Sequence, residues 1–388
     1  MVTLQTADNA LKSFYLDAVT DSLNTKVNPL LAQIKQTTAD VVGKDVKRLV
    51  RYGLNGGVGA GSETGSLPKS GGNMYVQFTA PLKNLYGTIE ISDKAIRASA
   101  TNEGAFVNLL NDEMQSLIKS AEFNFGRMLY GDGTGLIAEV VTQPAENQVV
   151  LTTLKNVCEG MVVDFYTEQN TPIGAGKGRR IIKIDKIENT VHLDGEYLPA
   201  STIGPGSRMY LQSSSGYELT GLAALFNDDP IYGVEKDIEL MKPYQSTCTT
   251  ITDMKMQATI DAIEEQSGGK INFIVCSWGV RRALMEYYKS IGVVLPTIDV
   301  AGGYKALSFN GIPVVVDRFC PQGTMYFLNT EDFQLHQLCD WQWLEGEDGK
   351  ILKQIPGKPV YTATLVKYAE LICTRPYGQG MLNNITEK

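Results

Sequence analysis

The 388-residue sequence predicts an α+β protein organised around one long helix. Three observations predict this class. An uninterrupted amphipathic stretch runs from Glu103 to Tyr130, β-prone runs precede and follow it, and helical and strand patterns alternate after residue 222. The segments before the long helix have no core of their own, so we expect them to be buried against another surface.

The long helix is predicted by the spacing of its apolar residues. They recur every three or four positions and share one stripe: Phe106, Leu109, Leu110, Met114, Leu117, Ala121, Phe125 and Met128. Asn102 can cap the N-terminus, and Gly131-Asp132-Gly133 ends the helix. At 1.5 Å per residue such a helix is about 40 Å long.

Composition argues against several classes of protein. A net charge of −8 and a pI near 5.1 argue against sequence-specific DNA binding. Only two histidines are present, which argues against a histidine-based metal or catalytic site. The six cysteines are widely separated, so we expect reduced thiols. No apolar run is long enough to span a membrane, and we expect no secretory signal at the N-terminus.

Residues 1–65 are predicted to form an arm. A first helix fits Asn9–Leu23, and a short second helix fits Asn28–Gln36. The apolar face of the first helix comprises Leu11, Phe14, Tyr15, Ala18, Val19 and Leu23. Four basic residues then recur at helical spacing: Lys44, Lys47, Arg48 and Arg51. They form either a solvated basic face or a contact with an acidic neighbouring subunit or with enclosed nucleic acid.

Residues 66–102 are predicted to form an extended hairpin. The glycine-rich stretch Gly53–Gly72 before it has the composition of a flexible linker. Met74–Phe78 and Tyr86–Ile91 are β-prone, and Pro81–Asn84 between them is a turn. A short helix over Ser92–Ser99 follows. The hairpin residues that we expect to contact a neighbouring subunit are Tyr75, Phe78, Lys83 and Tyr86.

After the helix segment (103–139), residues 140–221 are predicted to form an inserted β-barrel of five or six strands. Short β-branched runs alternate with glycine turns there: 149–152, 161–166, 180–186, 190–193 and 208–211. Lys177, Arg179 and Arg180 form a basic tip that we expect to contact a neighbour.

Residues 222–335 are predicted to form an α/β domain. Helices fit Thr252–Gln266, with Met254 on its apolar face, and Trp278–Ile291; strands fit 271–276, 311–316 and 324–328. Gly292–Gly303 is predicted to be an exposed loop. Residues 336–388 are predicted to be return strands, with Trp341 and Trp343 on one of them and Thr362–Thr374 as another.

Two glycine-rich stretches superficially imitate phosphate-binding loops. Gly57–Gly61 has no preceding strand or following helix, and Lys177 of Gly174–Gly178 is followed by glycine where a Walker loop needs Ser or Thr. A nucleotide-dependent enzyme is therefore the weaker hypothesis, and a phage tail or receptor-binding module is suggested only by the insertion. We predict no catalytic, cofactor-binding or metal-binding residues.

The order of these elements resembles the major capsid protein of tailed bacteriophages, the Hong Kong 97-type capsid fold. Three stretches carry the resemblance: Leu82–Ser99 (LKNLYGTIEISDKAIRAS), Gly221–Asp229 (GLAALFNDD) followed by Ile231–Val234 (IYGV), and Gly311–Asn329, which contains GIPVVVD and GTMYFLN. In that fold the six segments above correspond to the N-terminal arm, extended hairpin loop, spine helix of the peripheral domain, inserted barrel, axial domain and peripheral return strands.

The resemblance implies a shell subunit without catalysis. Copies of the chain would form hexamers and pentamers of an icosahedral head that encloses the phage genome, with non-specific contacts to packaged DNA. It also implies a separate scaffolding protein, a portal and a possible decoration protein, assembly in the host cytoplasm and location in the virion. Some members of the family cross-link a hairpin lysine to an asparagine, which makes Lys83 and Asn383 or Asn384 weak candidates. The alternative within the same fold is an encapsulin-type compartment.

Overall fold

The computed structural model describes residues 23, 28–94, 103–292, 297–300, 304–346 and 349–388. The chain divides into two compact units, which we describe separately. Unit 1 comprises Met1–Lys119 and Leu225–Lys388, and unit 2 comprises Ser120–Ala224. The predicted helix Asn9–Leu23 and most of the predicted helix Ser92–Ser99 lie outside the described residues.

The long helix is confirmed as α4 (Glu103–Met128). Met114, Phe125 and Met128 of the predicted stripe are buried, whereas Leu117 and Ala121 are half-buried. The side chains of Phe106, Leu109 and Leu110 lie outside the description. Strand β5 (Lys83–Ser92) passes close to this helix, because a Cβ atom on Gly87 would lie 2.9 Å from Leu117 Cδ1.

Unit 2 contains the predicted barrel, which is closed by six strands in the order β10-β7-β6-β11-β8-β9. The strands are β6 (Leu136–Ala145), β7 (Gln148–Leu151), β8 (Val162–Tyr166), β9 (Arg179–Asp185), β10 (Thr190–Leu193) and β11 (Arg208–Leu211). Their inward side chains form one apolar core, in which Val149, Phe165 and Met209 are fully buried. A short 3-10 helix, η3 (Gly174–Gly176), precedes β9.

Unit 1 contains a five-stranded sheet that begins with an N-terminal edge strand. Strand β1 (Lys35–Thr37) pairs in parallel with β18 (Phe333–Trp343), which pairs with β20 (Val360–Cys373). Strands β5 and β19 (Lys353–Gln354) both pair with β20. Trp341 and Trp343 lie on β18 as expected, and both are buried.

A seven-stranded sheet in unit 1 forms the α/β region, in the order β12-β21-β17-β13-β16-β15-β14. Its strands are β12 (Tyr244–Thr247), β13 (Phe273–Cys276), β14 (Thr297–Val300), β15 (Tyr304–Phe309), β16 (Ile312–Val316), β17 (Met325–Leu328) and β21 (Gly380–Asn383). Helices α6 (Asp253–Ser267) and α7 (Trp278–Ser290) pack their apolar residues into its core. A short helix, α5 (Leu222–Phe226), lies at the boundary between the two units in the sequence.

The third sheet of unit 1 consists of β2 (Val41–Val42), β3 (Asp45–Tyr52) and β4 (Met74–Pro81). Strand β3 corrects the prediction that Lys44, Lys47, Arg48 and Arg51 share a helical face. Val46 and Val50 are buried and alternate with more exposed neighbours, which is the two-residue period of a strand.

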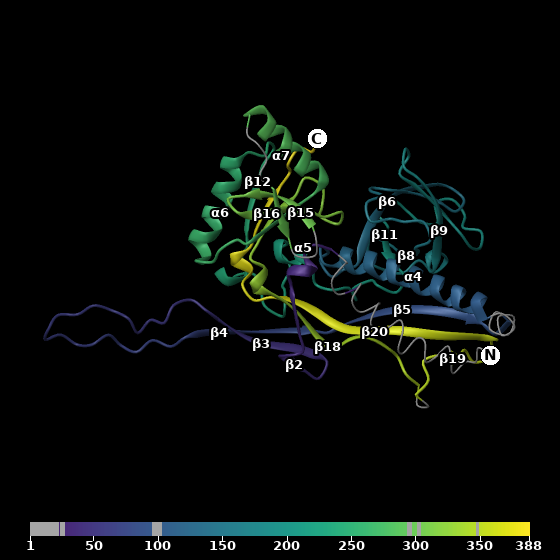
Figure 1. Cartoon of the computed structure of the whole chain (residues 1–388), viewed down its shortest axis with the longest axis horizontal. Coiled ribbons are helices and arrows are strands. Elements are labelled where there is room, and N and C mark those ends of the chain that lie inside the picture. Colours follow the sequence, from purple (N-terminus) through teal and green to yellow (C-terminus); the bar gives the residue numbers. More distant parts are fainter. Residues whose placement is uncertain (1–22, 24–27, 95–102, 293–296, 301–303, 347–348) are drawn as a thin grey trace. The chain divides into compact units, whose positions relative to one another are not determined.

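The predicted hairpin is also wrong in its pairing. Strand β4 pairs with β3, and β5 pairs with β20, so the two expected strands belong to different sheets. The stretch Gly53–Gly72 therefore connects the two strands of a hairpin and is not a linker between domains (Figure 1).

Four smaller predictions are corrected. Residues 28–36 form only the 3-10 turn η2 (Leu31–Gln33) before β1, and Asn28 Oδ1 accepts from Leu31 N at 2.7 Å. Met254 is 75% exposed although it lies on α6. The expected loop Gly292–Gly303 contains β14, and the C-terminal strand β21 joins the seven-stranded sheet instead of returning with β18 and β20.

Candidate assembly interface

The β3–β4 hairpin is a two-stranded ribbon held to the rest of unit 1 at its base. Its eight residue pairs run from Asp45 opposite Pro81 to Tyr52 opposite Met74. At the base, Leu82 N donates to Lys44 O and Lys47 N donates to Asp40 O, both at 2.9 Å. These two bonds fix the hairpin where it leaves the body.

Phe78 and Tyr232 form the apolar anchor of this base. Phe78 is fully buried, and its ring centroid lies 5.4 Å from that of Tyr232. Thr79 N donates to Tyr232 O at 2.9 Å. Phe78 is thus an internal anchor of the single chain, and its expected contact with a neighbouring subunit stays a prediction.

Tyr232 is the member of this anchor that sequence reasoning missed. Its hydroxyl donates to Leu371 O and accepts from Cys373 N, each at 3.1 Å, which ties it to β20. Burial raises the pKa of the phenol well above its ordinary value, so it remains a hydrogen-bond donor. In the sequence, Tyr232 was marked only as part of the IYGV stretch that carries the family resemblance. That resemblance does not indicate that Tyr232 packs on Phe78.

Away from the base, the hairpin exposes large apolar side chains. Leu49 is 64% exposed, Tyr75 is 53% exposed and Met74 is 50% exposed. The connecting loop exposes Leu54, Val58 and Leu67 almost completely. Exposed apolar side chains on a two-stranded ribbon indicate a surface that a partner covers.

The outward face of β3 combines this apolar surface with positive charge. Lys47, Leu49 and Arg51 alternate with buried Val46 and Val50, so the three share the exposed face. Lys44 is also exposed, at the turn before β3. Three of the four predicted basic contact residues are therefore accessible.

Arg48 lies on the opposite face and is half-buried. Its guanidinium Nη1 donates to Gln334 Oε1 on β18, and it also lies 3.5 Å from Asp40 Oδ2. These contacts are internal to unit 1, so Arg48 supports the base of the hairpin instead of extending its outward face.

The other two predicted hairpin residues lie on β5. Lys83 is half-buried opposite Ala369, and Tyr86 is 61% exposed opposite Val366 of β20. They belong to the sheet that contains β18 and β20, and not to the ribbon of β3 and β4. Asn383 and Asn384, the cross-linking candidates for Lys83, are at the end of β21 in another sheet.

The basic tip predicted in unit 2 is divided by burial. Lys177 and Arg180 are exposed, but Arg179 is buried. The Arg179 guanidinium donates to the carbonyl oxygens of Ala175 at 2.7 Å and Glu196 at 2.6 Å. Arg179 therefore joins two segments of the barrel within one chain, and its contact with a neighbour stays a prediction.

Buried polar side chains hold the N-terminal edge strand β1 to its sheet. Lys367 Nζ is fully buried and lies 2.9 Å from Asp340 Oδ1 and 3.1 Å from Gln36 Oε1. His336 Nδ1 lies 2.8 Å from Ala39 O. Burial lowers the pKa of both Lys367 and His336, and in Lys367 the charge of Asp340 opposes that effect. The sequence pattern of the strands did not indicate that Lys367 and His336 make these contacts.

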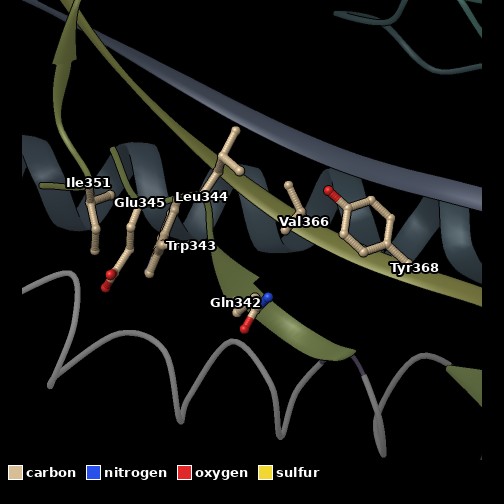
Figure 2. A pocket seen from close by; sticks show the side chains of 7 residues that line it. All are labelled: Gln342, Trp343, Leu344, Glu345, Ile351, Val366 and Tyr368. Carbon is tan, nitrogen blue, oxygen red and sulfur yellow. The ribbon is translucent and has the colours of Figure 1, made fainter. Parts of the chain in front are cut away.

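A cavity of about 660 Å³ opens beside the end of β18. Its lining residues come from β18, the segment after it and β20: Gln342, Trp343, Leu344, Glu345, Ile351, Val366 and Tyr368 (Figure 2). Trp343, Ile351 and Val366 are buried at its wall, whereas Gln342 and Glu345 are exposed at its rim. The accessible lining of the cavity is therefore mainly polar, although apolar side chains lie behind it.

The described residues contain no group of three or more His, Cys, Asp or Glu side chains that could hold a metal ion. Within the same residues, no helix combines the length and the apolar character that a membrane crossing requires. The stretch Gly57–Gly61 is exposed in the loop between β3 and β4, and Gly174–Gly176 form η3.

Comparison with known proteins gives matches in structure. No protein-family model matches the sequence, and no curated protein matches it. The capsid protein of cyanophage A-1(L) is similar over 93% of this chain and 94% of its own, with a TM-score of 0.56 and 12% identity. The SrpI encapsulin of Synechococcus elongatus PCC 7942 covers 93% of this chain and 89% of its own, with a TM-score of 0.49 and 10% identity. The capsid protein of a native GTA particle covers 92% and 90%, with a TM-score of 0.47 and 12% identity.

The cyanophage comparison extends over nearly the whole of both chains, and its low identity limits what it establishes to architecture. The matched region includes nearly all of the elements described above, from the N-terminal hairpin through α4 and the barrel to the seven-stranded sheet. The chain therefore has the Hong Kong 97-type capsid fold, with a small β-barrel inserted after the long helix.

Proposed function

We propose that this chain is the major capsid protein of a tailed bacteriophage. The observation that carries the proposal is the similarity to the cyanophage A-1(L) capsid protein, which covers more than nine-tenths of both chains. Its role is structural and not catalytic. Copies of it form hexamers and pentamers, and these close into an icosahedral shell around the genome.

The β3–β4 hairpin supports this function by its surface. It is anchored at its base by Phe78 and exposes Leu49, Tyr75 and two basic residues, Lys47 and Arg51, farther along. In a ring of subunits related head to tail, one such hairpin can lie on the next subunit all the way round. The net charge of −8 makes the rest of the subunit a suitable acceptor for this basic face.

Further partners follow from the same proposal. A separate scaffolding protein directs assembly, a portal occupies one vertex, and a decoration protein is a candidate ligand of the outer surface. Contacts with packaged DNA are non-specific and go to its phosphates. The mature location is the virion, after assembly in the host cytoplasm.

Electron microscopy of the purified chain, alone and with its co-expressed scaffolding protein, tests the proposal. We expect closed shells, or rings of five and six subunits. A monomer under every assembly condition, at protein concentrations up to those used for shell assembly, contradicts it. The genes beside this one provide an independent check, since a terminase and a portal gene are expected there.

A further inference from the structure

Two crossovers of the chain connect the seven-stranded and the five-stranded sheets of unit 1. The 3-10 turn η5 (Thr330–Asp332) leads from β17 to β18, and the return from β20 to β21 contains the 3-10 turn η6 (Pro376–Gly378). The crossovers lie side by side, because Thr374 N and Oγ1 donate to Asp332 O at 2.9 and 3.1 Å. We call this pair of crossovers the joint between the two sheets.

Gln379 links the two crossovers from the inside of the joint. Its side chain is fully buried. Its Oε1 accepts from Asn329 N at 2.9 Å, and its Nε2 donates to Asp332 Oδ2 at 3.1 Å and to Arg375 O at 3.2 Å. Its backbone oxygen accepts from Tyr244 N of the edge strand β12 at 3.0 Å. Because one buried amide serves both crossovers, loss of one of these bonds weakens the whole network.

Asp332 is the acidic member of this network, and it is 8% exposed. Burial raises the pKa of its carboxyl to about 6; the charge of Arg375 and the hydrogen bond from Gln379 act against this effect, and the charge of Glu331 adds to it. The Arg375 guanidinium is also engaged elsewhere, since its Nη2 donates to Ser267 O at the end of α6 at 2.7 Å.

Three other charged or titratable groups act on Asp332 in the described part of the chain. They are Glu331 from η5, and Arg375 and Cys373 from the return crossover and the end of β20. Burial raises the pKa of the Cys373 thiol well above its ordinary value, and the charge of Asp332 adds to this effect, so the thiol stays protonated near neutral pH. Asp332 itself changes its charge between pH 5 and 7.

The protonation of Asp332 is therefore linked to the opening of the joint. When the joint opens, water reaches the carboxyl, and its pKa returns toward the ordinary value of about 4. The closed joint binds the proton more tightly than the open joint, so low pH favours the closed form. The open fraction rises with pH between about 4 and 6 and levels off above that range.

We propose that this joint is a proton-sensitive hinge, which holds the two crossovers together while Asp332 is protonated and releases them when Asp332 ionises. The released joint frees the seven-stranded sheet to change its angle to the five-stranded sheet. The inference goes beyond the proposed shell function and is tested on unassembled subunits, so failure to form shells does not affect it.

Amide hydrogen exchange of the full-length subunit at pH 5, 6 and 7 tests the hinge, with each rate divided by the intrinsic chemical rate at that pH. The protection of the Asn329 and Thr374 amides, which donate across the joint, should fall by about fivefold from pH 5 to 6 and by less than about twofold from pH 6 to 7. The buried strand β13, with Ile274 and Val275, is the internal reference and should keep its protection. A flat profile at the joint, or an equal fall in β13, overturns the proposal.

Two neighbouring substitutions identify the group that titrates. Asp332→Asn keeps an oxygen acceptor for Gln379 Nε2 but carries no titrating proton, so protection at the joint should be the same at all three pH values. Glu331→Gln removes the same charge from the exposed neighbouring residue and should keep the fall, displaced to lower pH because the charge of Glu331 raises the pKa of Asp332. A fall in Asp332→Asn as large as in wild type, or its loss in Glu331→Gln, overturns the assignment to Asp332.

His336 on β18 cannot produce the expected fall. Burial lowers the pKa of its imidazole, so its protonation weakens the folded chain as the pH decreases. The hinge has the opposite sign, because it becomes weaker as the pH increases. A joint that loses protection toward pH 5 would therefore follow His336 and contradict the hinge.

Discussion

The barrel of unit 2 and the β3–β4 hairpin of unit 1 are both built from short antiparallel strands, but they bury their side chains differently. The barrel closes on itself, so every strand has two neighbours and the inward side chains share one core. The hairpin buries one face, on which Phe78 is the largest side chain, and it exposes Leu49, Tyr75 and Met74. The barrel can therefore be stable within one chain, because its own strands bury its apolar side chains.

The difference explains why the two regions would serve a shell in different ways. A closed barrel contributes a self-sufficient surface feature, and its edges are all paired. A two-stranded ribbon is marginal by itself and becomes stable when a partner covers its apolar face. Four predictions test this distinction, in order of their expected effect on the free energy of unfolding.

The barrel core should show the largest loss of stability. Phe165→Ala removes a fully buried ring and should lower the free energy of unfolding of unit 2 by about 3–5 kcal/mol. Hydrogen exchange of amides in β8 and β11 measures this loss. Ile182→Ala, at a 56% exposed position on β9, is the control and should change stability by less than about 0.5 kcal/mol.

The tryptophans show whether the barrel loses stability independently. All three, Trp278, Trp341 and Trp343, belong to unit 1. Their fluorescence transition in denaturant should therefore remain where it is in Phe165→Ala. A shift as large as the change in barrel exchange means that the two units unfold as one, and the comparison then fails.

The hairpin anchor should show the next largest effect. Phe78→Ala removes the buried contact with Tyr232 and should cost about 3 kcal/mol, since the ring is fully buried. Amides of Val46–Val50 should then exchange faster, and a protease should cut the loop between β3 and β4 sooner. Tyr75→Ala on the same strand is the control, because its side chain is already exposed. Similar effects from both variants would mean that the hairpin has no distinct anchor.

Elements whose signals lie within a single segment were predictable from the sequence. Helix α4 has its stripe and its glycine stop in one continuous stretch. Helix α6 begins at its predicted position because the Thr252 hydroxyl accepts from Lys255 N at 3.2 Å, a local cap. The barrel strands were predictable because their β-branched runs and glycine turns are also local.

Features that depend on pairing between distant segments were not predictable in this way. The spacing of Lys44, Lys47, Arg48 and Arg51 fits a helix, and only the partner strand β4 makes it a β-strand. Strand β21 joins β12 and β17, which lie far back in the sequence. Arg179 was predicted to lie on the surface because the sequence does not show its partners. These are carbonyl oxygens from two separate turns of the barrel. Of the candidate site, the exposed basic residues and Tyr75 could be chosen from the sequence, but not the anchor formed by Phe78 and Tyr232.

Acid should loosen the base of the hairpin by a smaller amount. Burial lowers the pKa of His336, with Arg48 acting in the same direction and Ala39 O and Asp40 against it. The unfolded chain therefore takes up a proton first as the pH falls below about 6.5. The stability that neutral His336 provides is complete above that pH and declines below it, by at most about 1.4 kcal/mol per pH unit.

Denaturation followed by tryptophan fluorescence at pH 7, 6 and 5 measures this decline. His336→Gln keeps a donor that can reach Ala39 O but removes the titration, so its stability should depend less on pH over this range. Exchange in the barrel serves as the internal reference. A wild-type chain and a His336→Gln variant with the same pH dependence would show that His336 does not control the base of the hairpin.

The smallest effect on stability should come from a substitution on the outward face of the hairpin. We nevertheless expect the same substitution to abolish shell assembly. Leu49→Asp changes a side chain that is 64% exposed, so the free energy of unfolding of the subunit should change by less than about 0.5 kcal/mol. In the shell proposed above the hairpin lies on the next subunit, so this position would be covered, and an unpaired carboxylate there would cost several kcal/mol at each of many identical interfaces. Electron microscopy should show no shells, while tryptophan fluorescence gives an unchanged denaturation curve.

Ile187→Asp, at a 94% exposed position between β9 and β10, makes the same change on the self-sufficient barrel and should assemble as wild type does. Shells from Leu49→Asp at wild-type yield would mean that the exposed apolar face of the hairpin stays in water, and the hairpin would then be no more an interface than the barrel.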